Sequence, residues 1–260
     1  MSNYQIRPLN TGTIILDKGY YVTAGIGLGQ EIEVPAIAWY LTDGQHQVLV
    51  DTGIAATELA DWHHAGSKQA AGQAVHELLE ALGVRPEKIE MVFFTHLHWD
   101  HCHNMDKFAN ARLVVGATEL AFALEPIPPY FKSYEYRALG MKAPFIGQRL
   151  EVIDGETELL PGLTAFPTPG HSIGHMSLAV DTSNGVHVIA GDAAFSYDNL
   201  TPAAAHLPFT MIGRYVNGIA AWQSLEAIVR RGDVVLPGHE PRVLDAELYP
   251  TSSPSVGRGR

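Results

Sequence analysis

The sequence predicts an α/β fold in which helices pack against β-sheets. Short β-branched or apolar runs recur along the 260 residues, and segments with apolar residues at helical spacing lie between several of them. Turns rich in Gly, Pro and possible metal ligands follow several of the runs. No linker or internal repeat divides the chain, so we expect one domain over residues 1–260, with residues 251–260 as a frayed Ser/Gly-rich tail.

The first third of the chain is predicted to begin with strands. The runs at residues 13–16, 36–41 and 48–50 are short and β-branched or aliphatic. The last of them ends in the turn Asp51-Thr52-Gly53. A helix is expected over residues 69–82, because apolar residues recur there at helical spacing and a glycine follows at the usual stop position.

The middle of the chain repeats this pattern and then loses it. Residues 92–94 and 113–115 are predicted to form short buried strands, and residues 118–124 a helix. From residue 125 to 148, prolines, aromatic residues and a glycine replace any regular period. We expect an inserted loop with short helices in this segment.

Four strands, a helix and a final strand are predicted after the loop. The four strands are expected at residues 150–153, 163–166, 176–180 and 186–190. The last two should form a hairpin, because Asn184-Gly185 lies in the turn between them. A helix over residues 217–230 and a strand at 234–236 complete the ordered part.

The segment between Thr95 and His101 carries the strongest chemical signal. It reads Thr-His-Leu-His-Trp-Asp-His and directly follows the apolar run at 91–94. Its possible metal ligands are His96, His98, Asp100 and His101. Imidazole and carboxylate groups bind zinc, iron or manganese, and groups this close together cannot all be buried without a cation or a partner. The segment therefore predicts a metal site.

Three further possible ligands each follow a strand-like run. They are His171, Asp192 and His239, and each comes directly after a glycine. Ligands in loops at strand ends can converge at one edge of a sheet, while the glycines let the backbone turn sharply. Six or seven such donors suit two metal ions.

The four ligand segments, in this order, resemble the metallo-β-lactamase superfamily over nearly the whole chain. The resemblance implies an αββα sandwich, in which two mixed β-sheets carry helices on their outer faces and a binuclear site lies at one edge. By motif position, one metal would be held by His96, His98 and His171, the other by Asp100, His101 and His239, and both by Asp192. Asp51 resembles the superfamily's supporting carboxylate, and His175 is expected to support or pack around the ligands.

Details of the motifs favour hydrolysis over redox chemistry. Related β-lactamases carry a cysteine where Asp192 stands, and flavodiiron proteins carry a carboxylate where this chain keeps His98. The segment 168–175 and the position of Trp99 are most similar to the quorum-quenching N-acyl-homoserine lactone lactonases and related lactone hydrolases. The resemblance implies that a metal-bridging hydroxide opens a lactone ring, with Asp100 holding the hydroxide and passing a proton to the leaving group.

One position departs from the lactonase pattern. Those enzymes usually carry a tyrosine three residues after the bridging aspartate, but Phe195 stands there and cannot donate a hydrogen bond. Either another hydroxyl, such as that of Tyr197 or Tyr215, takes its place or the substrate is a different small lactone.

Other functions on the same fold stay open at this point. A thioesterase like glyoxalase II is disfavoured by the short segment after His239, while a β-lactam or phosphotriester hydrolase would use the same hydroxide. A non-catalytic metal-binding protein is disfavoured by the complete ligand set. Two divalent metal ions are expected, zinc by default, with iron, manganese or cobalt as alternatives.

Composition limits the partners and the compartment. The formal charge is −11, with 17 basic against 28 acidic residues, which disfavours nucleic acid as a partner. The single cysteine, Cys102, and the absence of a signal-like or membrane-spanning run favour a cytoplasmic monomer or homodimer acting on a small lactone. Histidines without a motif are expected to be solvated or in the core: His63, His64, His76, His187 and His206.

Overall fold

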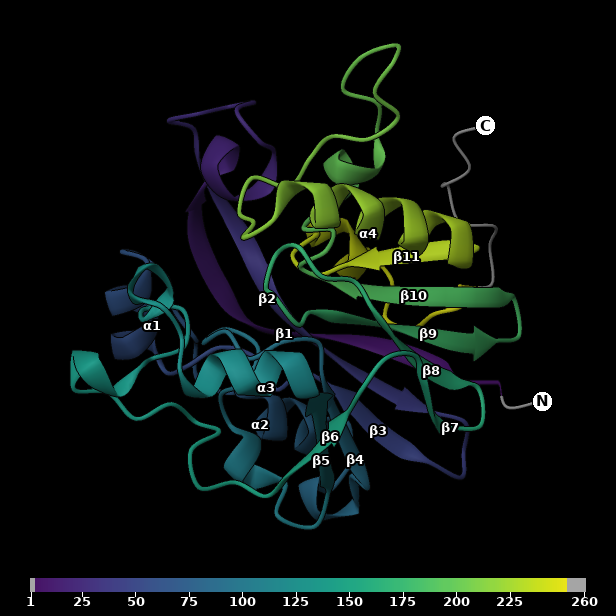
Figure 1. Cartoon of the computed structure of the whole chain (residues 1–260). Helices are drawn as coiled ribbons and strands as arrows, with labels where there is room; N and C mark the ends of the chain where they lie inside the picture. The colour runs from purple at the N-terminus through teal and green to yellow at the C-terminus, as the bar shows by residue number, and fades with distance from the viewer. Residues whose placement is uncertain (1–2, 252–260) are drawn as a thin grey trace.

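Two β-sheets lie face to face at the centre of the structure, a computed structural model that describes residues 3–251 (Figure 1). The first sheet has the order β1 (Gln5–Asp17), β2 (Glu31–Thr42), β3 (Gln47–Val50), β4 (Met91–Phe94), β5 (Arg112–Gly116) and β6 (Leu150–Ile153). Its first three strands are antiparallel and β3 to β6 are parallel. This sheet is therefore mixed.

The second sheet is also mixed. Its order is β11 (Val234–Pro237), β10 (Gly185–Gly191), β9 (Met176–Thr182), β8 (Leu163–Pro167) and β7 (Thr157–Leu160). Only the β10–β11 pair is parallel among these strands. Strands β9 and β10 form the predicted hairpin, with Thr182 paired to Gly185 across its turn.

The main core lies between the two sheets. Trp39 and Phe93 of the first sheet pack in one cluster with Leu178 and Ile189 of the second. Each large apolar side chain buried in this way contributes about 1.5–3 kcal/mol relative to an exposed one. The two sheets are thus held together by a continuous apolar layer.

Helices cover the outer face of each sheet (Figure 1). The helices are α1 (Thr57–His63), α2 (Val75–Ala81), α3 (Ala117–Leu124) and α4 (Gly218–Arg231). α2 and α3 pack on the first sheet, and α4 packs on β10 and β11 of the second. In α4 the buried Ala221, Leu225 and Ile228 recur at helical spacing, and Asn217 caps its first turn through Ala220 N at 3.1 Å. The αββα sandwich expected from the sequence is confirmed.

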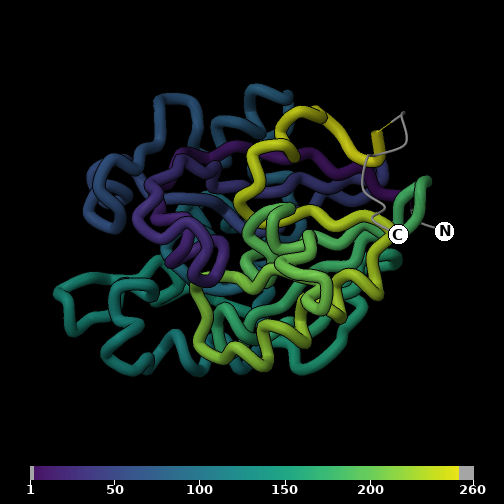
Figure 2. Tube along the Cα trace, turned by 90° about the horizontal axis from the view of Figure 1, so that it is seen from above, coloured from purple at the N-terminus to yellow at the C-terminus, as the bar shows by residue number. Residues whose placement is uncertain are grey.

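The end of the described chain returns to its beginning. Ile6 N donates to Tyr249 O at 2.8 Å, so the segment after β11 lies beside β1. Figure 2 shows this segment in yellow next to the purple N-terminal strands, while the teal segment between α3 and β6 extends away from the sheets. That teal segment is the predicted loop, with one-turn helices at Pro128–Tyr130 and Arg137–Leu139.

One predicted helix needs correction, and two elements were not predicted. The predicted helix over residues 69–82 begins only at Val75, because Gly72 has a left-handed φ of 81° and the Glu77 side chain accepts from Ala74 N at 3.1 Å. Helix α1 and strand β7 were not predicted, since each is short and lacks a clear apolar period.

The expected tail lies outside the described residues, apart from Thr251. Within the described chain, none of the helices is long and apolar enough to cross a membrane.

Candidate metal centre

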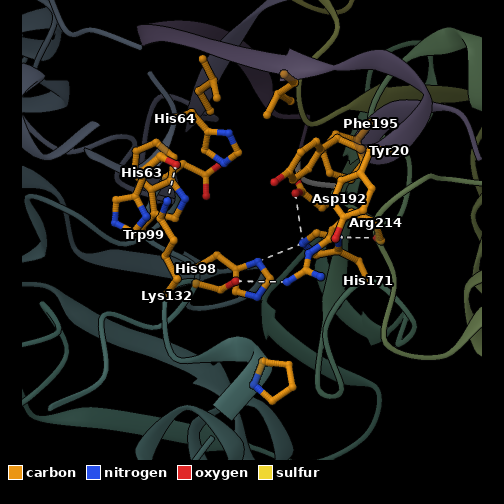
Figure 3. Close-up of a pocket in the computed structure, with 16 residues that line it drawn as sticks. Tyr20, His63, His64, His98, Trp99, Lys132, His171, Asp192, Phe195 and Arg214 are labelled. Carbon is orange, nitrogen blue, oxygen red and sulfur yellow. Dashed lines mark hydrogen bonds and ion pairs between the residues drawn. The ribbon is translucent and has the colours of Figure 1, made fainter. Parts of the chain in front are cut away.

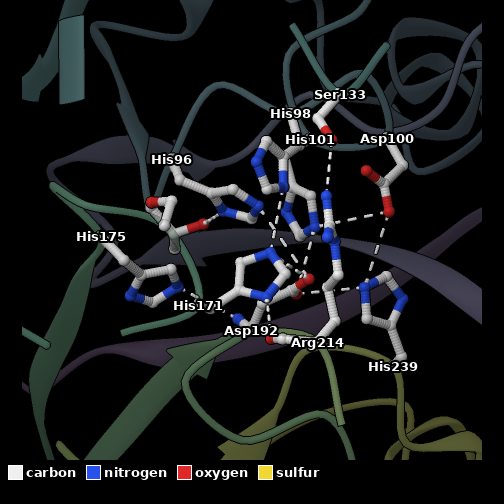
Figure 4. A network of polar contacts seen from close by, with 12 residues as sticks. His96, His98, Asp100, His101, Ser133, His171, His175, Asp192, Arg214 and His239 are labelled. Atoms are coloured by element: carbon white, nitrogen blue, oxygen red, sulfur yellow. Dashed lines mark hydrogen bonds and ion pairs between the residues drawn. The ribbon is translucent and has the colours of Figure 1, made fainter. Parts of the chain in front are cut away.

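Strand ends bring the seven predicted ligands to one edge of the two sheets (Figure 4). The first four lie on the loop after β4, and the others lie in the loops that follow β8, β10 and β11. The backbone turns sharply before Asp192, where Gly191 has a φ of 52° and a Cβ would lie 2.7 Å from His175 Nε2. Only glycine fits this position without moving the side chains around it.

Asp192 lies between two groups of imidazoles. Its Oδ2 is 3.2 Å from His171 Nε2 and 3.9 Å from His96 Nε2. Its Oδ1 is 3.2 Å from His101 Nε2 and 3.0 Å from His239 Nε2. A single buried carboxylate thus faces one pair of imidazole nitrogens with each oxygen.

The remaining two ligands complete one group each. His98 Nδ1 lies 3.0 Å from His171 Nε2, and Asp100 Oδ2 lies 3.7 Å from both His101 Nε2 and His239 Nε2. Three overlapping sets could hold a metal ion: His96, His98 and His171; His96, His101 and Asp192; Asp100, His101 and His239. These sets share His96 and His101, and Asp192 lies between them.

The donor atoms fit a cation because several have no hydrogen-bond partner. The buried atoms without one include His96 Nε2, His98 Nε2, His101 Nε2 and Asp192 Oδ1. Asp192 Oδ1 has imidazole nitrogens nearby, but their geometry makes no hydrogen bond. A buried polar atom left unpaired costs about 1–3 kcal/mol, so the grouping of His96 Nε2, His101 Nε2 and Asp192 Oδ1 favours a bound ion; His98 faces this group with Nδ1 and not with Nε2.

Burial sets the charge of the donors. It lowers the pKa of His96 and His98 well below the usual range, so both imidazoles are neutral, the form that binds metal. Burial acts to raise the pKa of Asp192, but His239 and His101 outweigh it and hold that pKa well below its usual range. Burial acts to lower the pKa of His101 and His239, but Asp192 and its neighbouring carboxylate Asp100 raise it above the usual range. These two rings would therefore bind a divalent cation in exchange for a proton, whereas His96 and His98 are already neutral.

Backbone carbonyls orient two of the rings. His171 Nδ1 donates to Arg214 O at 3.0 Å, and His239 Nδ1 donates to Pro35 O at 2.8 Å. Because Nδ1 carries the proton in a neutral ring that donates there, the lone pair of Nε2 faces the centre. These contacts could not be predicted from the sequence, since the partners lie 43 and 204 residues away.

Asp51 orients a third ring and the loop that carries it. Its Oδ2 accepts from His101 Nδ1 and from Thr95 Oγ1, each at 2.8 Å. Its Oδ1 accepts from Thr95 N at 2.8 Å. The structure therefore places Asp51 where the sequence predicted a supporting carboxylate.

His175 supports Asp192 and does not point into the centre. Its Nε2 accepts from Asp192 N at 3.1 Å, while Nδ1 lies 2.9 Å from Thr168 Oγ1. Burial lowers the pKa of His175 to about 3, so the ring is neutral and can accept this hydrogen bond. Its place agrees with the supporting role expected from the sequence.

Glu119, in the first turn of α3, was missed by the sequence analysis. Its buried carboxylate accepts from Leu97 N at 3.0 Å and from Tyr134 Oη at 2.9 Å. It also accepts from Ser172 Oγ at 2.6 Å and from Gly174 N at 3.2 Å. Glu119 thus ties the loop of His96 and His98 to the loop of His171, and no local motif marks it.

Glu119→Gln is expected to destabilise the protein. The amide nitrogen cannot accept the hydrogen bonds made by one carboxylate oxygen, so the free energy of unfolding should fall by about 1–3 kcal/mol. Urea unfolding followed by circular dichroism would measure this change. Glu125→Gln is the matched control, because Glu125 is exposed and solvent screens its ion pair with Arg137. Equal losses in the two variants would contradict the role of Glu119.

A cavity of about 240 Å³ opens beside the centre (Figure 3). Asp100, His98, His171 and Asp192 line its inner side. Its remaining lining includes Tyr20, Tyr21, His63, His64, Trp99, Lys132, Ser133, Phe195 and Arg214. The possible ligands therefore face a space large enough for a small molecule.

The predicted substrate contacts divide into two groups. Phe195 lines the cavity, with its ring centroid 5.1 Å from that of His239 and 5.3 Å from that of His171. The structure does not bring Tyr197 and Tyr215 to this cavity: Tyr197 packs against the core between the sheets, and Tyr215 is largely exposed. The ring of Tyr197 lies instead beneath the guanidinium of Arg242, with its centroid 4.8 Å from Cζ.

Other hydroxyls and imidazoles reach the cavity instead. Tyr20 and Tyr21 lie on one π-helical turn, Lys18–Val22, a rare geometry that often occurs at functional sites. His63 and His64 at the end of α1 were expected to be solvated or in the core, but both line the cavity. His63 is also buried in a stack on Trp99, at 4.1 Å between ring centroids. Because helix α1 was not predicted, no local pattern placed these two histidines at the cavity.

Comparisons with known proteins agree with this geometry. Residues 33–246 match the model of the family described as "Metallo-beta-lactamase superfamily". An N-acyl homoserine lactonase of Bacillus cereus is 23% identical over 240 residues, which cover 88% of this chain and 90% of that protein. One of Rhizobium radiobacter is 26% identical over 257 residues, covering 93% and 95%. The structure of an N-acyl homoserine lactone hydrolase with N-hexanoyl-L-homoserine at its catalytic metal centre superposes with a TM-score of 0.78 at 21% identity, over 96% of this chain and 99% of that one.

Proposed function

The chain belongs to the metallo-beta-lactamase superfamily, and we propose that it is a metal-dependent hydrolase that opens the ring of a small lactone, such as an N-acyl-homoserine lactone. One observation carries the proposal: Asp192 lies between two groups of buried histidines, at the wall of a cavity that could admit a small molecule. The lactonase activity of the relatives from Bacillus cereus and Rhizobium radiobacter supports the choice of a lactone.

Two divalent ions fit the donor set, with zinc as the default choice because imidazole and carboxylate ligands suit it. In this proposal His96, His98 and His171 hold one ion, Asp100, His101 and His239 hold the other, and Asp192 contacts both. Ions in such a site lower the pKa of water toward neutrality and polarise an ester carbonyl.

The chain's own residues provide the proton transfer and the shape of the site. The carboxylate of Asp100 faces both the centre and the cavity. It can therefore accept a proton from the attacking water and return it to the alkoxide oxygen of the opened ring. The hydroxyls of Tyr20, Tyr21 and Ser133 line the same cavity and are the candidates for orienting the ester in place of the tyrosine that Phe195 replaces.

A substrate panel tests the proposed function. The metal-loaded protein should acidify a weakly buffered pH-indicator solution with acyl-homoserine lactones and simple γ- and δ-lactones, but not with S-lactoylglutathione or a β-lactam. Removal of the metal by a chelator should abolish ring opening, and added zinc should restore it, because the proposed nucleophile depends on the ions. Hydrolysis of the thioester or the β-lactam alone, or full lactone turnover by metal-free protein, would refute the proposal.

A further inference from the structure

Arg214 lies at the wall of the centre through both its backbone and its side chain. Its carbonyl oxygen accepts from His171 Nδ1 at 3.0 Å, which fixes its main chain beside a proposed ligand. Its guanidinium lies over the ring of Tyr130, 5.1 Å from the centroid, and donates to Ser133 Oγ at 3.4 Å (Figure 4). The cation is therefore held in one place by neutral partners.

Lys132, the neighbour of Ser133, brings a second cation to the same cavity (Figure 3). Its Nζ donates to the carbonyl oxygen of His63 at 2.8 Å and lies 4.9 Å from the ring centroid of Trp62. These partners are also neutral. Helix α1, which provides both of them, thus orients the lysine at the rim of the cavity.

Neither cation has a carboxylate partner within 4.0 Å among the described residues. Among the other described lysine and arginine side chains, six also lack an acidic partner and seven pair with an acid: those of Arg7, Lys18, Lys107, Arg112, Arg137, Arg231 and Arg242. The chain carries 28 acids against 17 basic residues, so acids are not scarce. What sets Lys132 and Arg214 apart is that both line one cavity; Asp100 and Asp192 line its inner side, so an anionic group would bind at the wall formed by the two cations, away from those carboxylates.

We propose that Lys132 and Arg214 bind a carboxylate that the substrate carries in addition to its ester, so that the substrate class is a small carboxylated lactone. This inference rests on the proposed lactonase function and makes it narrower. The planar guanidinium can hold a carboxylate through two parallel hydrogen bonds, and the ammonium adds a second charge. A cavity of about 240 Å³ lies just below the usual range of ligand sites, about 300–1,000 Å³, and can take a small ring with a short charged substituent.

Binding of two ring-opened acids to the zinc-loaded protein tests this inference without any turnover. The probes are 4-hydroxybutanoate and 2-hydroxypentanedioate, which differ by one carboxylate; isothermal titration calorimetry would measure each Kd. The diacid should bind about tenfold or more tightly than the monoacid, because its second carboxylate gains charge-assisted hydrogen bonds. Arg214→Met and Lys132→Met should each reduce this selectivity ratio several-fold. Lys142→Met and Arg230→Met, at exposed positions away from the cavity, are the matched controls and should keep the ratio of the unmodified protein.

Kinetics with the matching lactones provide the second measurement. The ratio of kcat/KM for γ-butyrolactone γ-carboxylate to that for γ-butyrolactone should exceed one and should fall in Arg214→Met and Lys132→Met, mainly through a higher KM. The inference would be overturned if the two acids bound equally tightly, or if the variants lost affinity for both acids to the same extent. Either result would leave the proposed lactone hydrolysis in place. Selective diacid binding with no turnover of any lactone would instead refute the proposed function and leave the anion site in place.

Discussion

Asp192→Ala is expected to remove metal from both halves of the centre and to abolish lactone hydrolysis. Each oxygen of Asp192 faces one pair of imidazoles, at 3.0–3.9 Å, so the substitution removes a donor from both proposed ions at once. It also removes the negative charge that offsets two cations in a buried site. Turnover should fall by about a thousandfold or more, since the proposed chemistry depends entirely on the ions.

Metal analysis by mass spectrometry and lactone turnover on the same preparation would measure both effects. His98→Ala is an informative comparison, because His98 belongs to only one of the two proposed groups, and we expect it to lose one ion before the other. Asp181→Ala is the control, since Asp181 is exposed in the β9–β10 hairpin. An Asp192→Ala protein that binds about two ions and hydrolyses lactones at the original rate would refute the bridging role.

Local sequence predicted which side chains converge at the proposed metal centre, because their spacing is itself the signal. Four of the seven lie within six residues, at His96, His98, Asp100 and His101, and the others follow glycines at strand ends. Strand runs such as β4, buried on both faces, were equally visible because continuous apolar residues mark them. In these segments the apolar run in the sequence corresponds to residues that are buried in the fold.

The lining of the cavity could not be predicted in the same way. Lys132 and Arg214 are 82 residues apart in the sequence and share the cavity only because the loop after α3 folds against the segment before α4. Glu119 joins Leu97 to Ser172 by contacts that carry no period or motif. The lining of the cavity thus depends on long-range contacts between loops, whereas the proposed metal ligands are marked by their position next to a strand.

Asp51→Asn is expected to weaken metal binding without changing any proposed ligand. Asparagine tolerates the left-handed backbone at this position, where φ is 60°, so the substitution tests the side chain and not the turn. Its amide has one acceptor oxygen, whereas the Asp51 carboxylate accepts from Thr95 N, Thr95 Oγ1 and His101 Nδ1. His101 should therefore lose its fixed orientation and the carboxylate that strengthens it as a ligand.

The expected loss is about 10–100-fold in affinity for the ion near His101, as measured by competition with a chromophoric chelator. Turnover should fall at limiting zinc and recover in part at high zinc, because the ligands themselves remain. Asp43→Asn is the matched control: Asp43 also accepts from backbone amides, those of Gln45 and His46, but it lies in the β2–β3 turn at the other end of β3. If Asp51→Asn bound zinc as tightly as Asp43→Asn, orientation of His101 by Asp51 would not contribute to the centre, and the ring would have to be held by packing alone.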